Sequence, residues 1–205
     1  MSNLIHPTAV IEPSVKLGQG NYIGPFCYIT GDVQIGDNNR FEAHCSIGTP
    51  PEHTSYWHGK YQGVRIGDNN VIREFVTINS GTTKNTIVRS DCVILRGSYI
   101  GHDSYLEDKV TVSCNAVIAG NCHLFTGCNL GMSVSVHQYS VIGHYSMLGM
   151  SAVVTKKSQI MPGHTYVGVP ARLLKKNTIG LQKNQITDEE LARLTVTFSQ
   201  FQKKI

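Results

Sequence analysis

Charged side chains are scarce in this chain of 205 residues: Asp, Glu, Lys and Arg make up 16% of it, against roughly 25% in an ordinary soluble domain. The net charge is only +4 and no Lys/Arg stripe alternates with aromatic residues, so a nucleic-acid partner is not expected. No apolar run approaches the roughly 18 residues of a membrane span. The N-terminal residues Met1-Ser2-Asn3-Leu4 also lack a signal-peptide pattern. We therefore expect a cytoplasmic protein without stable membrane insertion.

The common motifs for metals and cofactors are also missing. The chain contains neither Cys-x-x-Cys nor His-Glu-x-x-His, which are typical metal and redox motifs. The glycine pair Gly18-Gln19-Gly20 lacks the third glycine of a dinucleotide-binding loop. We predict no metal site and no bound cofactor.

An aliphatic residue recurs at every sixth position through most of the chain. The 24 marker positions contain Ile, Leu or Val at all but one, which is Phe41. The markers are Ile5, Ile11, Leu17, Ile23, Ile29, Ile35, Phe41 and Ile47, then Ile66, Ile72 and Ile78, then Val88, Ile94, Ile100, Leu106, Val112, Ile118, Leu124, Leu130, Val136, Ile142, Leu148, Val154 and Ile160. This is a hexapeptide repeat.

A period of six fits short strands better than an amphipathic helix, because six is divisible by two and not by 3.6. Three hexads make one triangular coil, so the repeat predicts an all-β solenoid of about eight coils with the markers stacked inside. The position two before each marker must also be small, since it faces the same narrow interior. Five of the six cysteines, all except Cys114, fall there. We interpret them as core thiols in a reducing compartment.

Two phase breaks and a tail interrupt the repeat. The first break is an aromatic insertion at about residues 49–64, predicted to be a flap over a site. The second, residues 80–87, is short and polar. The chain thus divides into a repeat domain at 1–170 and a basic C-terminal segment at 171–205. In that segment a capping box at Thr187 predicts a short α-helix. Its apolar stripe is Leu191, Leu194, Phe198, Phe201 and Ile205.

Polar residues with chemical potential gather in one column. Because a coil has 18 residues, positions 102, 120 and 138 stack on one edge of the solenoid. The column contains His102, Gly120, Asn121, His137 and Gln138. A lone edge histidine is as readily a solvated surface residue, but this combination beside an aromatic insertion favours a site.

These features resemble the UDP-N-acetylglucosamine O-acyltransferase family, within the hexapeptide acyltransferases. The resemblance rests on Ile72-Arg73-Glu74-Phe75-Val76-Thr77-Ile78, Ile100-Gly101-His102-Asp103, Val136-His137-Gln138-Tyr139 and Asn177-Thr178-Ile179-Gly180-Leu181. It implies a left-handed parallel β-helix, a homotrimer with sites between subunits, and an acyl carrier protein thioester as donor. The acceptor would be the 3-hydroxyl of the nucleotide sugar, in the pathway to lipid A.

The resemblance also implies roles for single residues. His102 would be the general base, Asp103 would orient it or contact the sugar, and the Gly120 amide would bind the oxyanion. The substrate-binding residues would be Lys60, Asn79, Asn121, His137, Gln138, Asn177 and Lys183. Met150 lies where the family measures acyl length, and its size favours a relatively short chain; a packing role between subunits is the alternative reading.

The chain departs from the family pattern at several positions. Asn79 and Asn121 replace histidines, and Lys183 and Asn184 replace arginines. The helical C-terminal part is also shorter. Because Lys lacks the bidentate fork of Arg, we expect rearranged diphosphate contacts.

Two other functions stay open at this point. The segment Val167-Gly168-Val169-Pro170-Ala171-Arg172 is common in hexapeptide enzymes that use acetyl-CoA, which favours a nucleotide-sugar amine N-acetyltransferase as the main rival. A non-catalytic trimeric scaffold is the second alternative. Acyl transfer by the intact protein, and its loss on replacing His102, separates these possibilities.

Overall fold

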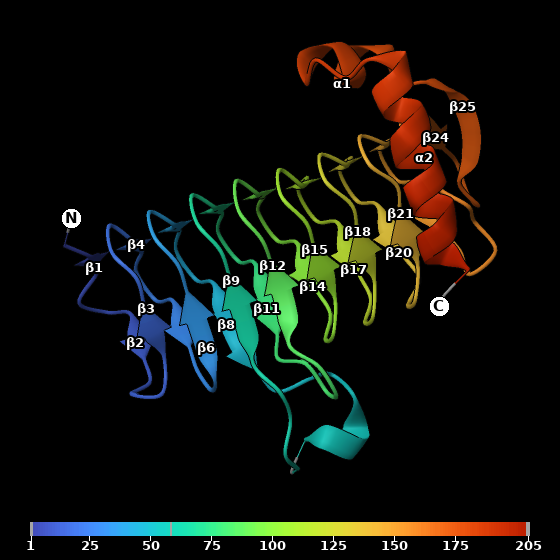
Figure 1. Cartoon of the computed structure of the whole chain (residues 1–205). Helices are drawn as coiled ribbons and strands as arrows, with labels where there is room; N and C mark the ends of the chain where they lie inside the picture. The colour runs from blue at the N-terminus through green and yellow to red at the C-terminus, as the bar shows by residue number, and fades with distance from the viewer. Residues whose placement is uncertain (1, 58, 204–205) are drawn as a thin grey trace.

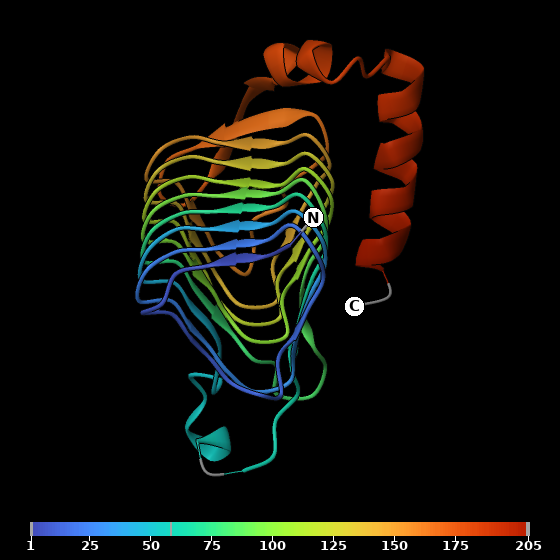
Figure 2. The ribbon, with the colours of Figure 1, turned by 90° about the vertical axis from the view of Figure 1, so that its left-hand side faces the viewer.

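The computed structural model describes residues 2–57 and 59–203, so Ile205, the last residue of the predicted stripe, lies outside the described residues. The chain winds into a parallel β-solenoid of triangular cross-section (Figures 1 and 2). As far as β23, each coil contributes one short strand to each of three sheets, so strands three apart in order are hydrogen-bonded neighbours. The predicted solenoid is confirmed.

The first sheet has ten strands, of which the last is antiparallel. They are β1 (Leu4–Ile5), β4 (Tyr22–Ile23), β7 (Arg40–Phe41), β10 (Val71–Ile72), β13 (Val93–Ile94), β16 (Thr111–Val112), β19 (Asn129–Leu130), β22 (Met147–Leu148), β24 (His164–Val167) and β25 (Arg172–Lys176).

The second sheet has eight strands. They are β2 (Val10–Ile11), β5 (Tyr28–Ile29), β8 (Ser46–Thr49), β11 (Thr77–Asn79), β14 (Tyr99–Ile100), β17 (Val117–Ile118), β20 (Ser135–Val136) and β23 (Val153–Val154). The third sheet has seven. They are β3 (Lys16–Leu17), β6 (Val33–Ile35), β9 (Val64–Ile66), β12 (Thr86–Val88), β15 (Tyr105–Leu106), β18 (His123–Leu124) and β21 (Val141–Ile142).

Three edges connect the sheets, and we name them by the direction of the chain. Turns of the first edge lead from the first sheet to the second, those of the second edge from the second to the third, and those of the third edge back to the first. The aromatic insertion at about residues 49–64 leaves the second edge between β8 and β9 and contains a 3₁₀ turn at Thr54–Tyr56. Figure 1 shows it projecting from the prism.

The marker residues form the core, as the repeat predicts. Markers pair in register across neighbouring coils, for example Ile100 with Ile118. Ile47 pairs with Ile78 across the first insertion, so the insertion leaves the ladder unbroken. The markers from Ile23 to Ile160 are at most 4% exposed. Tyr166, also 4% exposed, pairs with Leu148 and extends the ladder by one aromatic position.

The small positions two before the markers carry both thiols and amides. Cys27, Cys45, Cys92, Cys122 and Cys128 are buried, Cys114 is half-buried, and all six are free thiols. An asparagine ladder runs through the same positions at the third edge. In it, the Oδ1 atom of Asn39 accepts hydrogen bonds from both the backbone and side-chain nitrogens of Asn70, each at 2.9 Å. Each amide thus satisfies a buried backbone donor of the next coil.

The C-terminal segment is more ordered than its composition indicates. Strand β25 pairs antiparallel with β24, which covers the open sheet edge that ends the solenoid. Two helices follow, α1 (Thr178–Lys183) and α2 (Asp188–Gln202). The predicted cap is confirmed, since the Thr187 hydroxyl accepts from the Glu190 amide at 3.2 Å. Neither helix in the described part of the chain has the length and hydrophobicity of a bilayer-spanning segment.

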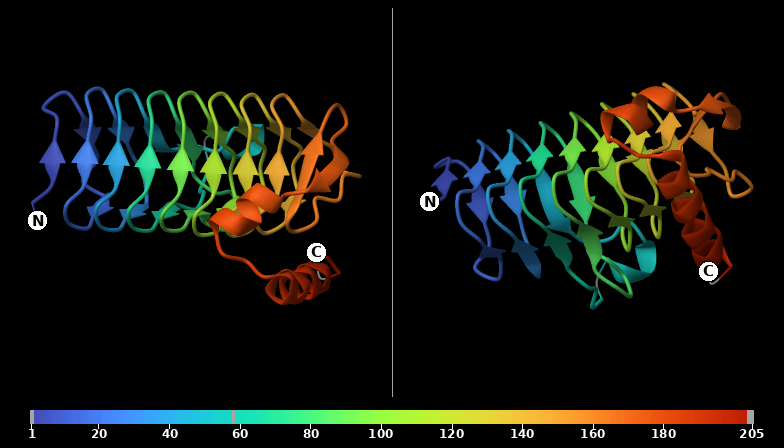
Figure 3. Two further views of the ribbon diagram at one scale, coloured as in Figure 1. Left: turned by 90° about the horizontal axis from the view of Figure 1, so that it is seen from above. Right: turned by 45° about the horizontal axis from the view of Figure 1, so that its top comes forward.

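Helix α2 lies along one side of the prism (Figures 2 and 3). Aromatic residues make its contact there. Phe198 is fully buried, with its ring centroid 5.5 Å from that of Phe125. Phe125 also meets Phe201 at 5.2 Å and His144 at 4.5 Å. This small cluster holds the helix against the prism.

Replacing Phe198 by Ala should therefore loosen α2 while leaving the coils intact. Removing a buried Phe costs about 3–5 kcal/mol, so amide hydrogen exchange within 188–202 should speed up at least about 100-fold. Val196→Ala is the matched control, because Val196 lies on the same helix and is 57% exposed. Equal exchange in the two variants would contradict this packing.

Candidate functional site

The predicted polar column is present on the second edge. Positions 102, 120 and 138 lie on successive coils, because β14, β17 and β20 are paired in register. The backbone binds these turns together: the Asn121 amide donates to the His102 carbonyl at 2.8 Å, and the Tyr139 amide donates to the Gly120 carbonyl at 3.2 Å. The column is thus a rigid part of the solenoid.

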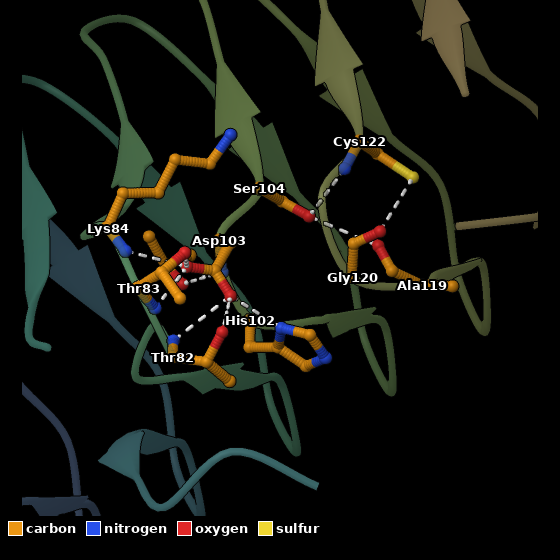
Figure 4. A network of polar contacts seen from close by, with 10 residues as sticks. Thr82, Thr83, Lys84, His102, Asp103, Ser104, Ala119, Gly120 and Cys122 are labelled. Carbon is orange, nitrogen blue, oxygen red and sulfur yellow. Dashed lines mark hydrogen bonds and ion pairs between the residues drawn. The ribbon is translucent and has the colours of Figure 1, made fainter. Parts of the chain in front are cut away.

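His102 and Asp103 form a hydrogen-bonded pair at the centre of this edge (Figure 4). The Nδ1 atom of His102 lies 2.6 Å from Oδ2 of Asp103. The His102 side chain is 15% exposed and the Asp103 side chain is fully buried. A carboxylate at Nδ1 fixes the proton there and leaves Nε2 as the acceptor that a general base requires.

The second phase break, residues 80–87, donates several hydrogen bonds to the Asp103 carboxylate. The sequence did not predict this contact. Oδ2 accepts from the Thr82 hydroxyl at 2.6 Å and the Thr82 amide at 3.0 Å. Oδ1 accepts from the amides of Thr83 and Lys84 at 2.9 and 2.8 Å. The sequence signal for this contact was the polar run Thr82-Thr83-Lys84 on the same edge as His102. Spacing alone does not show which way the amides of this run point.

These donors decide the charge of Asp103. Burial alone would raise its pKa, but the hydrogen bonds from Thr82, Lys84 and His102 outweigh it and hold the pKa well below the ordinary value. Asp103 is therefore a carboxylate at neutral pH. Asp103 is fully buried, and its carboxylate is hydrogen-bonded to Nδ1 of His102.

Gly120 leaves room for the His102 ring. A Cβ atom at position 120 would lie 2.5 Å from Cε1 and 2.6 Å from Nε2 of His102. Any larger residue would push the imidazole away. Among the hydrogen bonds of residues 2–57 and 59–203, none uses the Gly120 amide N–H as a donor. This donor and the basic nitrogen of His102 lie together on the edge.

The insertion approaches the same histidine. The rings of His53 and His102 meet edge to face at 6.1 Å, and His53 in turn contacts Tyr56 at 5.4 Å. Lys60 is exposed further along the insertion. His53 was not singled out from the sequence, and its position in an aromatic insertion on this edge was the available signal.

The other predicted residues of this edge differ in exposure. His137 and Gln138 are exposed at the turn after β20, and Asn121 is half-buried. Asn79 is only 2% exposed, and its Nδ2 donates to Thr49 Oγ1 and the Pro50 carbonyl at 3.1 and 3.2 Å. Asn79 therefore holds the start of the insertion in this structure.

Three further predicted residues lie on other edges of the same chain. Asn177 and Lys183 line a cavity of about 510 Å³ beside α1. Asn177 Nδ2 donates to the carbonyl of Tyr145 on the third edge at 2.8 Å. Met150 is on the first edge and 67% exposed. One subunit thus does not bring these residues to His102.

Comparisons with known proteins identify the family. The model of bacterial transferase hexapeptide repeats matches residues 14–49. The UDP-N-acetylglucosamine O-acyltransferase of Herminiimonas arsenicoxydans, named as acting with acyl carrier protein, is 38% identical over 92% of this chain and 79% of its own. The chain belongs to the UDP-N-acetylglucosamine O-acyltransferase family. It is thus an acyltransferase-family protein built on hexapeptide repeats.

Solved structures of this family share the fold. The Francisella novicida UDP-N-acetylglucosamine acyltransferase has a TM-score of 0.81 and 29% identity, covering 95% of this chain and 78% of that one. The Campylobacter jejuni enzyme has a TM-score of 0.80 and 29% identity, covering 95% and 82%. The Gloeothece citriformis relative is 30% identical over 83% of this chain, which spans only 61% of that protein. This chain is thus shorter than its relatives.

Replacing Asp103 by Asn should destabilise the protein in a pH-dependent way. The stabilisation from a carboxylate with a depressed pKa is present above its unfolded value of about 3.9 and is lost as the pH falls below it. At pH 7 we expect the unfolding free energy to fall by about 3 kcal/mol. Denaturant unfolding between pH 7 and pH 3 measures this difference. If the difference in unfolding free energy between the two proteins stayed constant as the pH falls, Asp103 would not be an ionised carboxylate held by these hydrogen bonds.

Proposed function

We propose that this protein transfers an acyl group from an acyl carrier protein thioester to the 3-hydroxyl of UDP-N-acetylglucosamine, as the first step toward lipid A in the cytoplasm. The observation that carries the proposal is the His102–Asp103 pair at 2.6 Å beside the Gly120 amide. The names of the family's relatives supply the donor and acceptor classes. No resident cofactor takes part.

The geometry supports a direct transfer. The acceptor hydroxyl attacks the thioester carbonyl carbon while its proton moves to Nε2 of His102. The resulting imidazolium is stabilised by the Asp103 carboxylate. The Gly120 amide donates to the developing oxyanion. The C–S bond then breaks, and His102 returns the proton to the leaving thiolate.

A homotrimer would bring the remaining predicted residues to this site. Apolar side chains are exposed along the second sheet and the first edge, which a subunit interface would cover. They are Val10, Phe26, Tyr28, Phe75, Val117, Met132 and Met150. On the first edge the rings of Phe26, His44 and Phe75 also stack at 5.1 and 4.9 Å. A neighbouring subunit would then present Asn177 and Lys183 to the nucleotide sugar bound at His102, His137 and Gln138.

His102→Ala should lower acyl transfer by about 10²–10⁴-fold, the usual contribution of a general base. The assay supplies UDP-N-acetylglucosamine with 3-hydroxyacyl carrier proteins, and in parallel acetyl-CoA with an amino nucleotide sugar. His6→Ala, on the first coil, is the matched control and should keep full activity. Transfer only from acetyl-CoA to the amine would favour the N-acetyltransferase. No transfer by the unaltered trimer would favour the scaffold.

Met150→Gly should shift the donor preference toward longer acyl chains. The exposed thioether of Met150 would fill the end of the acyl groove in a trimer, so its removal frees room for several methylenes. Each buried methylene contributes about 0.8 kcal/mol, so two more carbons should improve relative kcat/KM at least about tenfold. Met132→Gly, on the preceding coil of the same edge, is the comparison. An unchanged chain-length profile would assign Met150 to subunit packing alone.

A further inference from the structure

Two of the buried thiols lie one above the other near the N-terminal end of the core. Cys27 directly precedes β5 and Cys45 directly precedes β8, and these strands pair in register. The Tyr28 amide donates to the Cys45 carbonyl at 2.8 Å, which fixes the two coils against each other. Neighbouring strands lie about 4.8 Å apart, inside the Cα separation of about 4.4–6.8 Å that a disulfide spans. The backbone thus holds the two cysteines at a distance that a disulfide can bridge.

The two side chains also point to the same place. The carbonyl oxygen of Glu42 lies 2.9 Å from Sγ of Cys27 and 3.2 Å from Sγ of Cys45. Two sulfur atoms that contact one oxygen atom are neighbours, and both residues are only 1% exposed.

The other cysteines have no such partner. Cys92 and Cys128 lie two coils apart, with Val110 between them. The Cys122 amide accepts its side-chain contact from Ser104, whose hydroxyl oxygen lies 3.2 Å away on the preceding coil. Among the six cysteines, all within the described residues, Cys27 and Cys45 are thus the only pair on successive coils.

The contact between the two thiols makes them chemically unequal. The hydrogen bond from Cys45 lowers the pKa of Cys27 to about 7, against the opposing effect of burial. The same contact, together with burial, raises the pKa of Cys45. Burial also raises the pKa of Cys92 and of Cys122 to about 12. Because the thiolate is the reactive form, Cys27 is the most nucleophilic of these buried thiols at neutral pH.

The position of Cys27 also gives a small oxidant a way in. Only the first coil lies between Cys27 and the N-terminal end of the prism (Figure 1). That coil is held at this point by the Val10 amide, which donates to the Cys27 carbonyl at 2.8 Å. Its residues Leu4 and Ile5 are 67% and 43% exposed, so few buried contacts hold it closed. Such a segment opens more readily than the interior coils.

We propose that Cys27 and Cys45 are a redox modification site, at which a hydroperoxide forms a reversible disulfide between successive coils. The Cys27 thiolate attacks one peroxide oxygen and the O–O bond breaks, which gives a sulfenic acid and hydroxide. The Cys45 sulfur then attacks the Cys27 sulfur, and the S–O bond breaks as the oxygen leaves as water with the Cys45 proton. In sum, two thiols and one hydrogen peroxide give one disulfide and two waters. A thiol reductant returns both cysteines by exchange.

Peptide mass spectrometry of the full-length protein tests the assignment. The reduced, folded protein is treated with hydrogen peroxide, alkylated and digested without reductant. We expect a peptide pair joined through Cys27 and Cys45, the loss of two of the six thiols, and their recovery with dithiothreitol. Cys27 should react at least about tenfold faster than Cys92, because a larger share of it is thiolate.

Two variants separate the pair from the other thiols. Cys45→Ala should form no disulfide and should leave a Cys27 sulfenic acid that dimedone traps. This variant should fold, since Ala9 and Ala116 occupy the equivalent position in other hexads. Cys92→Ala is the matched control and should keep the Cys27–Cys45 link.

The disulfide should also be visible in the backbone. Because it closes a loop over residues 27–45, amide hydrogen exchange in that range should slow at least about tenfold in the oxidised protein, and not in peroxide-treated Cys45→Ala. A Cys27–Cys45 link that forms only in denaturant overturns the proposal. So does oxidation that falls first on the half-buried Cys114, or at equal rates on all the thiols.

Discussion

The backbone hydrogen bonds between successive coils govern the rest of this structure. Since neighbouring strands pair in register, residues 18 apart lie directly above one another. This constraint places one marker above the next in the core, and it also places Gly120 above His102 on the edge. The geometry of the candidate site therefore follows from the same stacking that stabilises the solenoid.

The residues inserted at the two breaks in the repeat contact side chains on the edge from which they leave the solenoid. Both phase breaks lie on the second edge, and each contacts the His102–Asp103 pair. The shorter break, residues 80–87, supplies backbone amides that keep the buried Asp103 carboxylate ionised. A regular hexad turn has too few N–H donors for this. An irregular loop can aim several N–H groups at one point, because its amides are not committed to a ladder.

The sequence predicted the parts that periodicity controls. The three sheets, the buried thiols, the column from His102 to Gln138 and the cap at Thr187 all follow from spacing and local chemistry. The parts it missed depend on directions that spacing does not encode. The amides of Thr82 to Lys84 could have faced solvent, Asn79 could have faced a ligand, and β25 forms only because β24 leaves an open edge.

The distribution of the predicted substrate residues argues that a single chain is not a complete catalyst. His102 lies on the second edge, Asn177 contacts the third and Met150 lies on the first. The buried marker side chains fill the interior of the prism in the part of the chain that the structure describes, so these residues lie on its outside. Its outward faces can converge only on those of another prism. For this fold, the assembly proposed above would therefore be part of the active site itself, and losing it would separate the base from the groups that hold its acceptor.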